Sequence, residues 1–129
     1  MTQSEIESIS SALSTLQRAA VRIRSIEDEA REALLINDDP ETYRKKLEEK
    51  AELLMKLSDL AGPFCEEMSE DTRAEFGAEL KSLAKRAAQA LKLSSTFYMS
   101  ALLYPEDYRE GDPNDLELLI DRLRIKYLS

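Results

Sequence analysis

The chain of 129 residues contains no histidine. Histidine is a frequent ligand of catalytic zinc, the partner of carboxylates in di-iron bundles and the base that activates serine or cysteine nucleophiles. The sequence therefore excludes most of the enzymes that are built on helical bundles. We predict no catalytic residue, no cofactor and no metal site.

Cysteine and glycine are also rare, with one Cys and three Gly. Cys65 has no partner for a disulfide within the chain, so nothing here requires an oxidising compartment. Its neighbours Glu66 and Glu67 disfavour a thiolate, and we expect a small apolar filler. No glycine lies close to another, which excludes a glycine-rich phosphate loop.

Long apolar runs are missing as well. No segment reaches the roughly 18 uninterrupted apolar residues of a membrane span. Residues 1–20 lack the basic start and apolar run of a signal peptide. We therefore expect a cytoplasmic protein with no membrane partner.

Basic residues are outnumbered, with 18 Lys and Arg against 26 Asp and Glu and a net charge of −8. Phosphate backbones repel such a chain, so we expect no nucleic-acid partner. The largest basic cluster is interleaved with glutamates and is predicted to lie on a solvated helix face. It consists of Arg44, Lys45, Lys46 and Lys50.

Apolar residues recur every three or four positions along most of the chain, as from Ile6 through Leu13 to Ile23. This period places them on one stripe of a helix. Mostly short connections separate four such segments, which makes neighbouring helices antiparallel. The sequence predicts one all-α domain over residues 1–129. Its expected form is an antiparallel four-helix bundle with two long and two shorter helices, at residues 3–36, 41–61, 70–103 and 114–127.

Two helix starts carry the same signal. Asp39 and Asp112 are followed by Pro40 and Pro113. Aspartate favours the N-cap, and proline favours the first helical position. Both aspartates are therefore predicted to be N-caps.

The predicted helix ends rest on residues that leave helical geometry. Asn37 tolerates the left-handed conformation of a C-cap, and Gly62 with Pro63 ends the second helix. Ser94 interrupts the third stripe, and with Ser95 it marks a bend there.

Glutamates three residues apart raise one enzymatic alternative. All-helical nucleotide pyrophosphatases hold magnesium with such pairs on neighbouring helices. In so acidic a chain this spacing is common by chance, and we expect ordinary solvated carboxylates. The pairs are Glu29 with Glu32, Glu49 with Glu52, and Glu67 with Glu70.

Glu27 is the one acid on the inner register of the first helix, between Ile23 and Ala30. A shift of the stripe onto Ile26 turns Glu27 outward, where Arg31 can pair with it. We expect this outward position.

Half of the eight aromatic residues lie within residues 97–108. A helix over this stretch is apolar on nearly every side and must be covered all round. One short helix and a charged loop offer too little cover. We therefore predict a homodimer contact or a docking surface, with burial in the core as an equal alternative. The predicted partner-binding residues are Phe97, Tyr98, Leu102, Leu103, Tyr104 and Tyr108.

We therefore expect a non-enzymatic interaction protein that acts through apolar helix surfaces on a protein partner or on a second copy of itself. An adaptor, an export-chaperone-like factor and a small subunit all fit. In composition alone, the chain is similar to the cytoplasmic export chaperones of the flagellar and type III kind. The alternative is a magnesium-dependent enzyme resembling the nucleotide pyrophosphatases.

Overall fold

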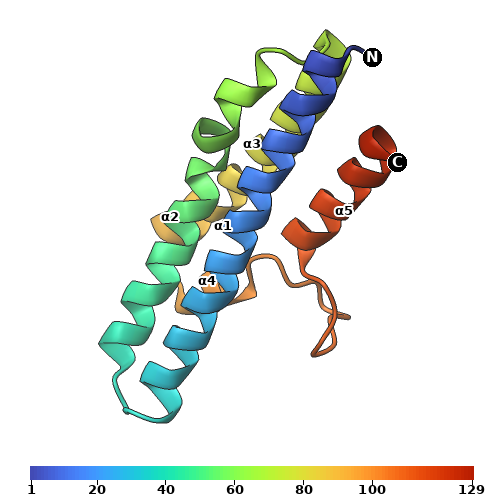
Figure 1. The fold of residues 1–129 in the computed structure, drawn as a ribbon. Helices are drawn as coiled ribbons and strands as arrows, with labels where there is room; N and C mark the ends of the chain where they lie inside the picture. The colour runs from blue at the N-terminus through green and yellow to red at the C-terminus, as the bar shows by residue number, and fades with distance from the viewer.

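The computed structural model describes residues 1–129 and contains five α-helices and no β-strand (Figure 1). The five helices pack around a shared hydrophobic core, which confirms the predicted all-α class. None of them is both long and apolar enough to cross a bilayer. The helices are α1 (Gln3–Leu35), α2 (Pro40–Cys65), α3 (Glu70–Lys92), α4 (Thr96–Ala101) and α5 (Asp115–Leu128).

The core follows the apolar stripes of the sequence. On α1, the predicted stripe residues Leu13, Leu16, Ala20 and Ile23 are at most 1% exposed. Burial of one large aliphatic side chain contributes about 1.5 to 3 kcal/mol, so these stripes supply most of the stabilising energy of the helix.

α1 and α2 form an antiparallel hairpin (Figure 1). Thr2 is the N-cap of α1, and its side chain accepts a hydrogen bond from the N–H of Glu5. In the turn between the helices, Asp38 takes the left-handed conformation that we expected of Asn37, with φ 49°. Aspartate tolerates this region because its short side chain can form local hydrogen bonds.

α2 begins where the sequence predicts and ends later. Asp39 is the N-cap and accepts the N–H of Thr42. The helix then continues through Pro63 to Cys65, so the predicted end at residue 61 is wrong. Pro63 removes one backbone donor and crowds the preceding turn, but Cys65 and Met68 after it are buried against the core, which offsets this cost.

The long helix expected over residues 70–103 is divided into α3 and α4. Ser69 is the N-cap of α3, which ends at Lys92. Ser94 has a φ of 50°, and the N–H groups of Ser94 and Ser95 donate to carbonyls of the last turn of α3. These bonds end a helix, where the sequence predicted only a bend. Ser95 then caps α4.

α5 runs antiparallel to α3, because ion pairs join the two helices in reverse order. The pairs are Glu75 with Lys126, Glu79 with Arg122, and Arg86 with Asp115.

The predicted N-cap of α5, Asp112, is wrong. Asn114 is the N-cap: its side chain accepts the N–H of Glu117, whose carboxylate accepts the N–H of Asn114. The carboxylate of Asp112 accepts the N–H of Arg109 in the preceding loop. Asn114 is fully buried, and burying an amide costs far less free energy than burying a carboxylate.

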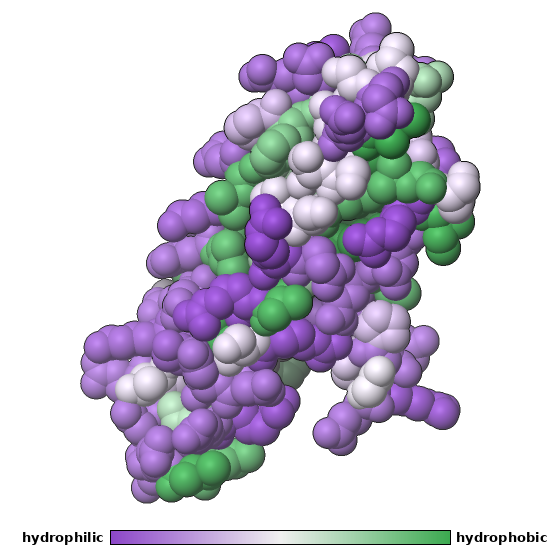
Figure 2. Space-filling model, viewed as in Figure 1, coloured by the Kyte–Doolittle hydropathy of each residue, from purple (hydrophilic) through white to green (hydrophobic).

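The lower part of the α1–α2 hairpin extends beyond α4 and beyond the start of α5 (Figure 1). We call this part the overhang (residues 28–47). Its surface is mostly hydrophilic, with an apolar patch at the far end (Figure 2). Leu35 and Ile36 in the turn are 72% and 75% exposed. The overhang therefore carries apolar side chains that no other helix covers.

Replacing Asn114 by alanine removes the capping box of α5 and should lower the free energy of unfolding by about 0.5 to 2 kcal/mol. Asp112→Ala is the matched control, because Asp112 is exposed and caps no helix, and it should cost less than about 0.5 kcal/mol. Urea denaturation of both variants measures the difference. A larger loss for Asp112→Ala would show that the aspartate before proline fixes the start of α5.

Candidate functional site

A buried ion pair joins α1 to α2. The side chain of Lys50 is 0% exposed, and its Nζ lies 2.9 Å from Oε2 of Glu27. The ammonium also donates to the carbonyl oxygen of Ser100, at 3.2 Å. Two predictions are wrong here, because Lys50 does not lie on a solvated face and Glu27 does not turn outward. Arg31 pairs with Asp28 instead.

Tyr104 completes the surroundings of this pair. Its hydroxyl donates to Oε1 of Glu27, and its ring centroid lies 5.1 Å from Nζ of Lys50. The ammonium therefore has a carboxylate, a backbone carbonyl and an aromatic face around it. Together these contacts offset the cost of removing both charges from water.

Burial also changes the acid–base properties of the two donors. It lowers the pKa of Lys50, against the opposing effect of Glu27. It raises the pKa of Tyr104, and the hydrogen bond to Glu27 raises this pKa further. Tyr104 therefore stays protonated, as a donor to Glu27, throughout the neutral pH range.

Arg24 extends these contacts to α5 and to the loop before it. Its guanidinium lies 2.7 Å from Oε1 of Glu117 and donates to the hydroxyls of Tyr104 and Tyr108 and to the carbonyl of Asp112. The hydrogen bond between Arg24 and Glu117 raises the pKa of the first and lowers that of the second. We call this set the polar network: Arg24, Glu27, Lys50, Tyr104, Tyr108 and Glu117.

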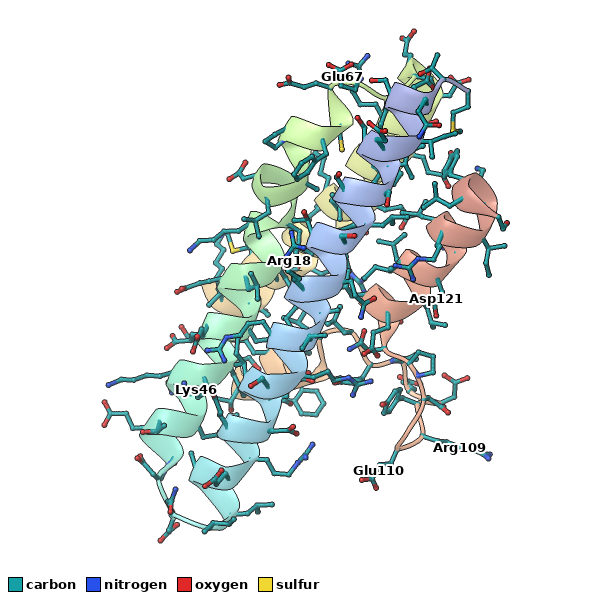
Figure 3. The ribbon with its side chains drawn as sticks, viewed as in Figure 1. Arg18, Lys46, Glu67, Arg109, Glu110 and Asp121 are labelled. Atoms are coloured by element: carbon teal, nitrogen blue, oxygen red, sulfur yellow. The ribbon has the colours of Figure 1, made fainter.

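A cleft of about 890 Å³ lies between the overhang and the loop of residues 105–113. Every member of the polar network except Glu117 lines its base, and the overhang supplies an apolar wall that includes Leu34, Leu35 and Tyr43. Glu110 lines the opposite side of the cleft and lies at the projecting tip of the loop (Figure 3). Figure 2 shows the notch between these two parts of the molecule. A cleft of this size can take a small molecule or a few side chains of a protein segment.

Two of the predicted partner-binding residues are exposed. Phe97 is 73% and Tyr98 is 53% exposed, and their rings meet edge to face with centroids 5.5 Å apart. Leu93, at the end of α3, is also exposed. We call Leu93, Phe97 and Tyr98 the aromatic corner.

The other predicted partner-binding residues lie elsewhere. Leu102 and Leu103 are buried in the core with Met99, so the expectation that one chain could not cover them is wrong. The reason is that α4 ends at residue 101, which lets the chain turn inward. Tyr104 and Tyr108 are half-buried in the polar network and line the cleft.

The carboxylates of the magnesium alternative do not gather at one place. Glu29 pairs with Lys46 and Arg22, and Glu49 pairs with the same two cations. Glu67 lies at the α2–α3 turn, far along the molecule from that group (Figure 3). No group of three or more acidic or thiol side chains is placed to hold a metal ion.

Cys65 is a buried member of the core, as the sequence predicted. Burial raises the pKa of its thiol. The thiolate of Cys65 is therefore disfavoured by burial, and not by the predicted repulsion from Glu66 and Glu67.

The polar network was not predicted from the sequence, although the sequence contains one signal of it. Lys50 stands three residues after Leu47 and four before Leu54, both of which face the core. A lysine on the inner stripe of one helix and Glu27 on the inner register of its neighbour are complementary. No comparable signal marked Arg24, whose partners lie about 80 to 93 residues away in sequence.

Comparison with protein-family models, with curated proteins and with solved structures finds no match to this chain.

Lys50→Met leaves Glu27 buried without its cation and should lower the free energy of unfolding by about 3 to 5 kcal/mol. Adding Glu27→Gln to this variant removes the unpaired charge, and we expect it to recover a large part of the loss. Urea denaturation of the two single variants and the double variant gives the coupling free energy. If the loss in the double variant equals the sum of the losses in the two single variants, the two side chains do not interact.

The hydrogen bond from Arg24 holds the pKa of Glu117 below its ordinary value of 4.5. The ionised carboxylate of Glu117 therefore contributes fully to stability above about pH 4.5. This contribution is lost as the pH falls through the folded-state pKa of Glu117. Glu117→Gln should lower stability more at about pH 7 than at about pH 3. Denaturation of wild type and variant at both pH values tests this, and an equal difference at both would contradict it.

Proposed function

We propose that this chain is a non-enzymatic interaction protein that binds a protein partner through apolar side chains its own fold leaves in water. An adaptor, an export-chaperone-like factor and a small subunit all fit this mode of action. We place it in the cytoplasm and propose no role for nucleic acid, membrane, metal or cofactor.

The aromatic corner is the observation that carries this proposal. Met99 faces the core from α4, whereas Phe97 and Tyr98 on the same short helix face water. Burying aromatic rings at an interface removes a large apolar area from water, and aromatic residues are enriched in protein–protein interfaces. Leu93, four residues before Phe97 in the sequence, is a third exposed large apolar residue.

In our interpretation, α1, α2, α3 and α5 form the antiparallel four-helix bundle and α4 displays the aromatic corner. The simplest partner is a second copy of the chain, with the two corners in contact across a two-fold axis. The magnesium-dependent alternative loses support because Glu29 and Glu49 are already paired with Arg22 and Lys46.

The double change Phe97→Asp plus Tyr98→Asp should abolish association while helicity and melting temperature stay close to wild type, because both side chains are already exposed. Sedimentation velocity measures self-association. A photo-crosslinking residue at position 97, introduced in the native host, detects a different partner.

Leu118→Asp plus Ile125→Asp is the matched control, since both are exposed apolar residues on α5, away from the corner. We expect it to leave association unchanged. Unfolding of the Phe97 and Tyr98 variant would mean that the corner is part of the core. A rise in the wild-type melting temperature with millimolar magnesium would favour the enzymatic alternative.

A further inference from the structure

The cleft beside the overhang has the form of a docking groove. Its apolar wall comes from both helices of the hairpin, with Leu34 and Leu35 from α1 and Tyr43 from α2. No other helix of the chain covers Leu35, which is 72% exposed. Two adjacent helices with an uncovered apolar face are a common seat for a third helix.

The base of this groove is fixed before any partner arrives. Lys50, Glu27 and Tyr104 satisfy one another there, and Arg24 holds the loop on the far side. A preorganised groove loses little conformational entropy on binding, which favours affinity. The charges at the base are already paired, so recognition by charge must come from the rim.

The rim is strongly acidic. The overhang and the loop of residues 105–113, which frame the cleft, contain ten acidic and five basic residues. All ten acids except Glu29 and Asp39 are exposed. Several of these carboxylates make no ion pair within the chain, and a cationic partner would neutralise them. They are Glu32, Asp38, Glu106, Asp107 and Glu110.

We propose that the cleft docks a short amphipathic helix of a protein partner, with leucine-like side chains against the overhang and lysine or arginine along its flanks. A second copy of this chain is the wrong occupant, because it would bring the same acidic rim into contact with itself. This inference rests on the proposed function and names a different surface and the chemistry of the partner.

The experiment uses fluorescently labelled peptides and the full chain. One peptide carries leucine at helical spacing with lysine elsewhere. A second replaces every lysine by glutamate, and a third scrambles the leucine–lysine sequence so that no apolar face forms. Fluorescence anisotropy near physiological salt should give binding of the first peptide at least about tenfold tighter than of the other two, with affinity falling as salt rises.

Matched variants locate the site. Leu35→Glu should weaken binding by about tenfold or more, and Ile125→Glu, an equally exposed apolar residue on α5, by less than about twofold. Asp28→Lys with Glu110→Lys should weaken binding and flatten its salt dependence. Glu67→Lys, in the acidic α2–α3 turn at the other end of the hairpin, should change neither the affinity nor its salt dependence (Figure 3).

Several outcomes would overturn the proposal. These are no binding of the leucine–lysine peptide, equal binding of the scrambled or acidic peptide, or equal effects of Leu35→Glu and Ile125→Glu. A dimer that Leu35→Glu dissociates in sedimentation would assign the cleft to a second copy. If the peptide tests fail while crosslinking at position 97 captures a partner, this inference falls and the proposed function stands.

Discussion

The ion pair between Lys50 and Glu27 is the interaction on which one end of the molecule depends. Either charge alone would be costly in the core, by several kcal/mol. The pair is tolerated because the hydroxyl of Tyr104 and the carbonyl of Ser100 complete its contacts. These groups come from α1, α2, α4 and the segment after α4. Satisfying one buried pair therefore fixes four parts of the chain, which non-directional apolar contacts would not do.

The rest of this end follows from that constraint. With residue 100 held at Lys50, α4 lies against the hairpin with Met99 inward and Phe97 and Tyr98 in water. Arg24 then ties the following loop to the start of α5. The overhang and the loop consequently stand on either side of a cleft with a fixed base. Both surfaces that we propose for binding are products of the same polar network.

The sequence predicted the helices better than it predicted the site. The apolar period predicted the class and the core stripe of α1, and N-cap propensity predicted the cap at Asp39, because these depend on neighbours in sequence. Ser94 could be read as a bend or an end, since a polar residue in a stripe fits both. Capping propensity favoured Asp112 as strongly as Asn114, and only burial distinguishes them.

Local chemistry thus determined an acidic, all-helical chain without the residues for imidazole-based catalysis. Tertiary structure alone decided which polar groups are buried together. Lys50 and Glu27 are 23 positions apart, and the contacts of Arg24 reach residue 117. Neither residue reveals its partner in its own helix. The cost of burying either charge is offset only when the opposite charge, from a distant segment, lies within hydrogen-bonding distance.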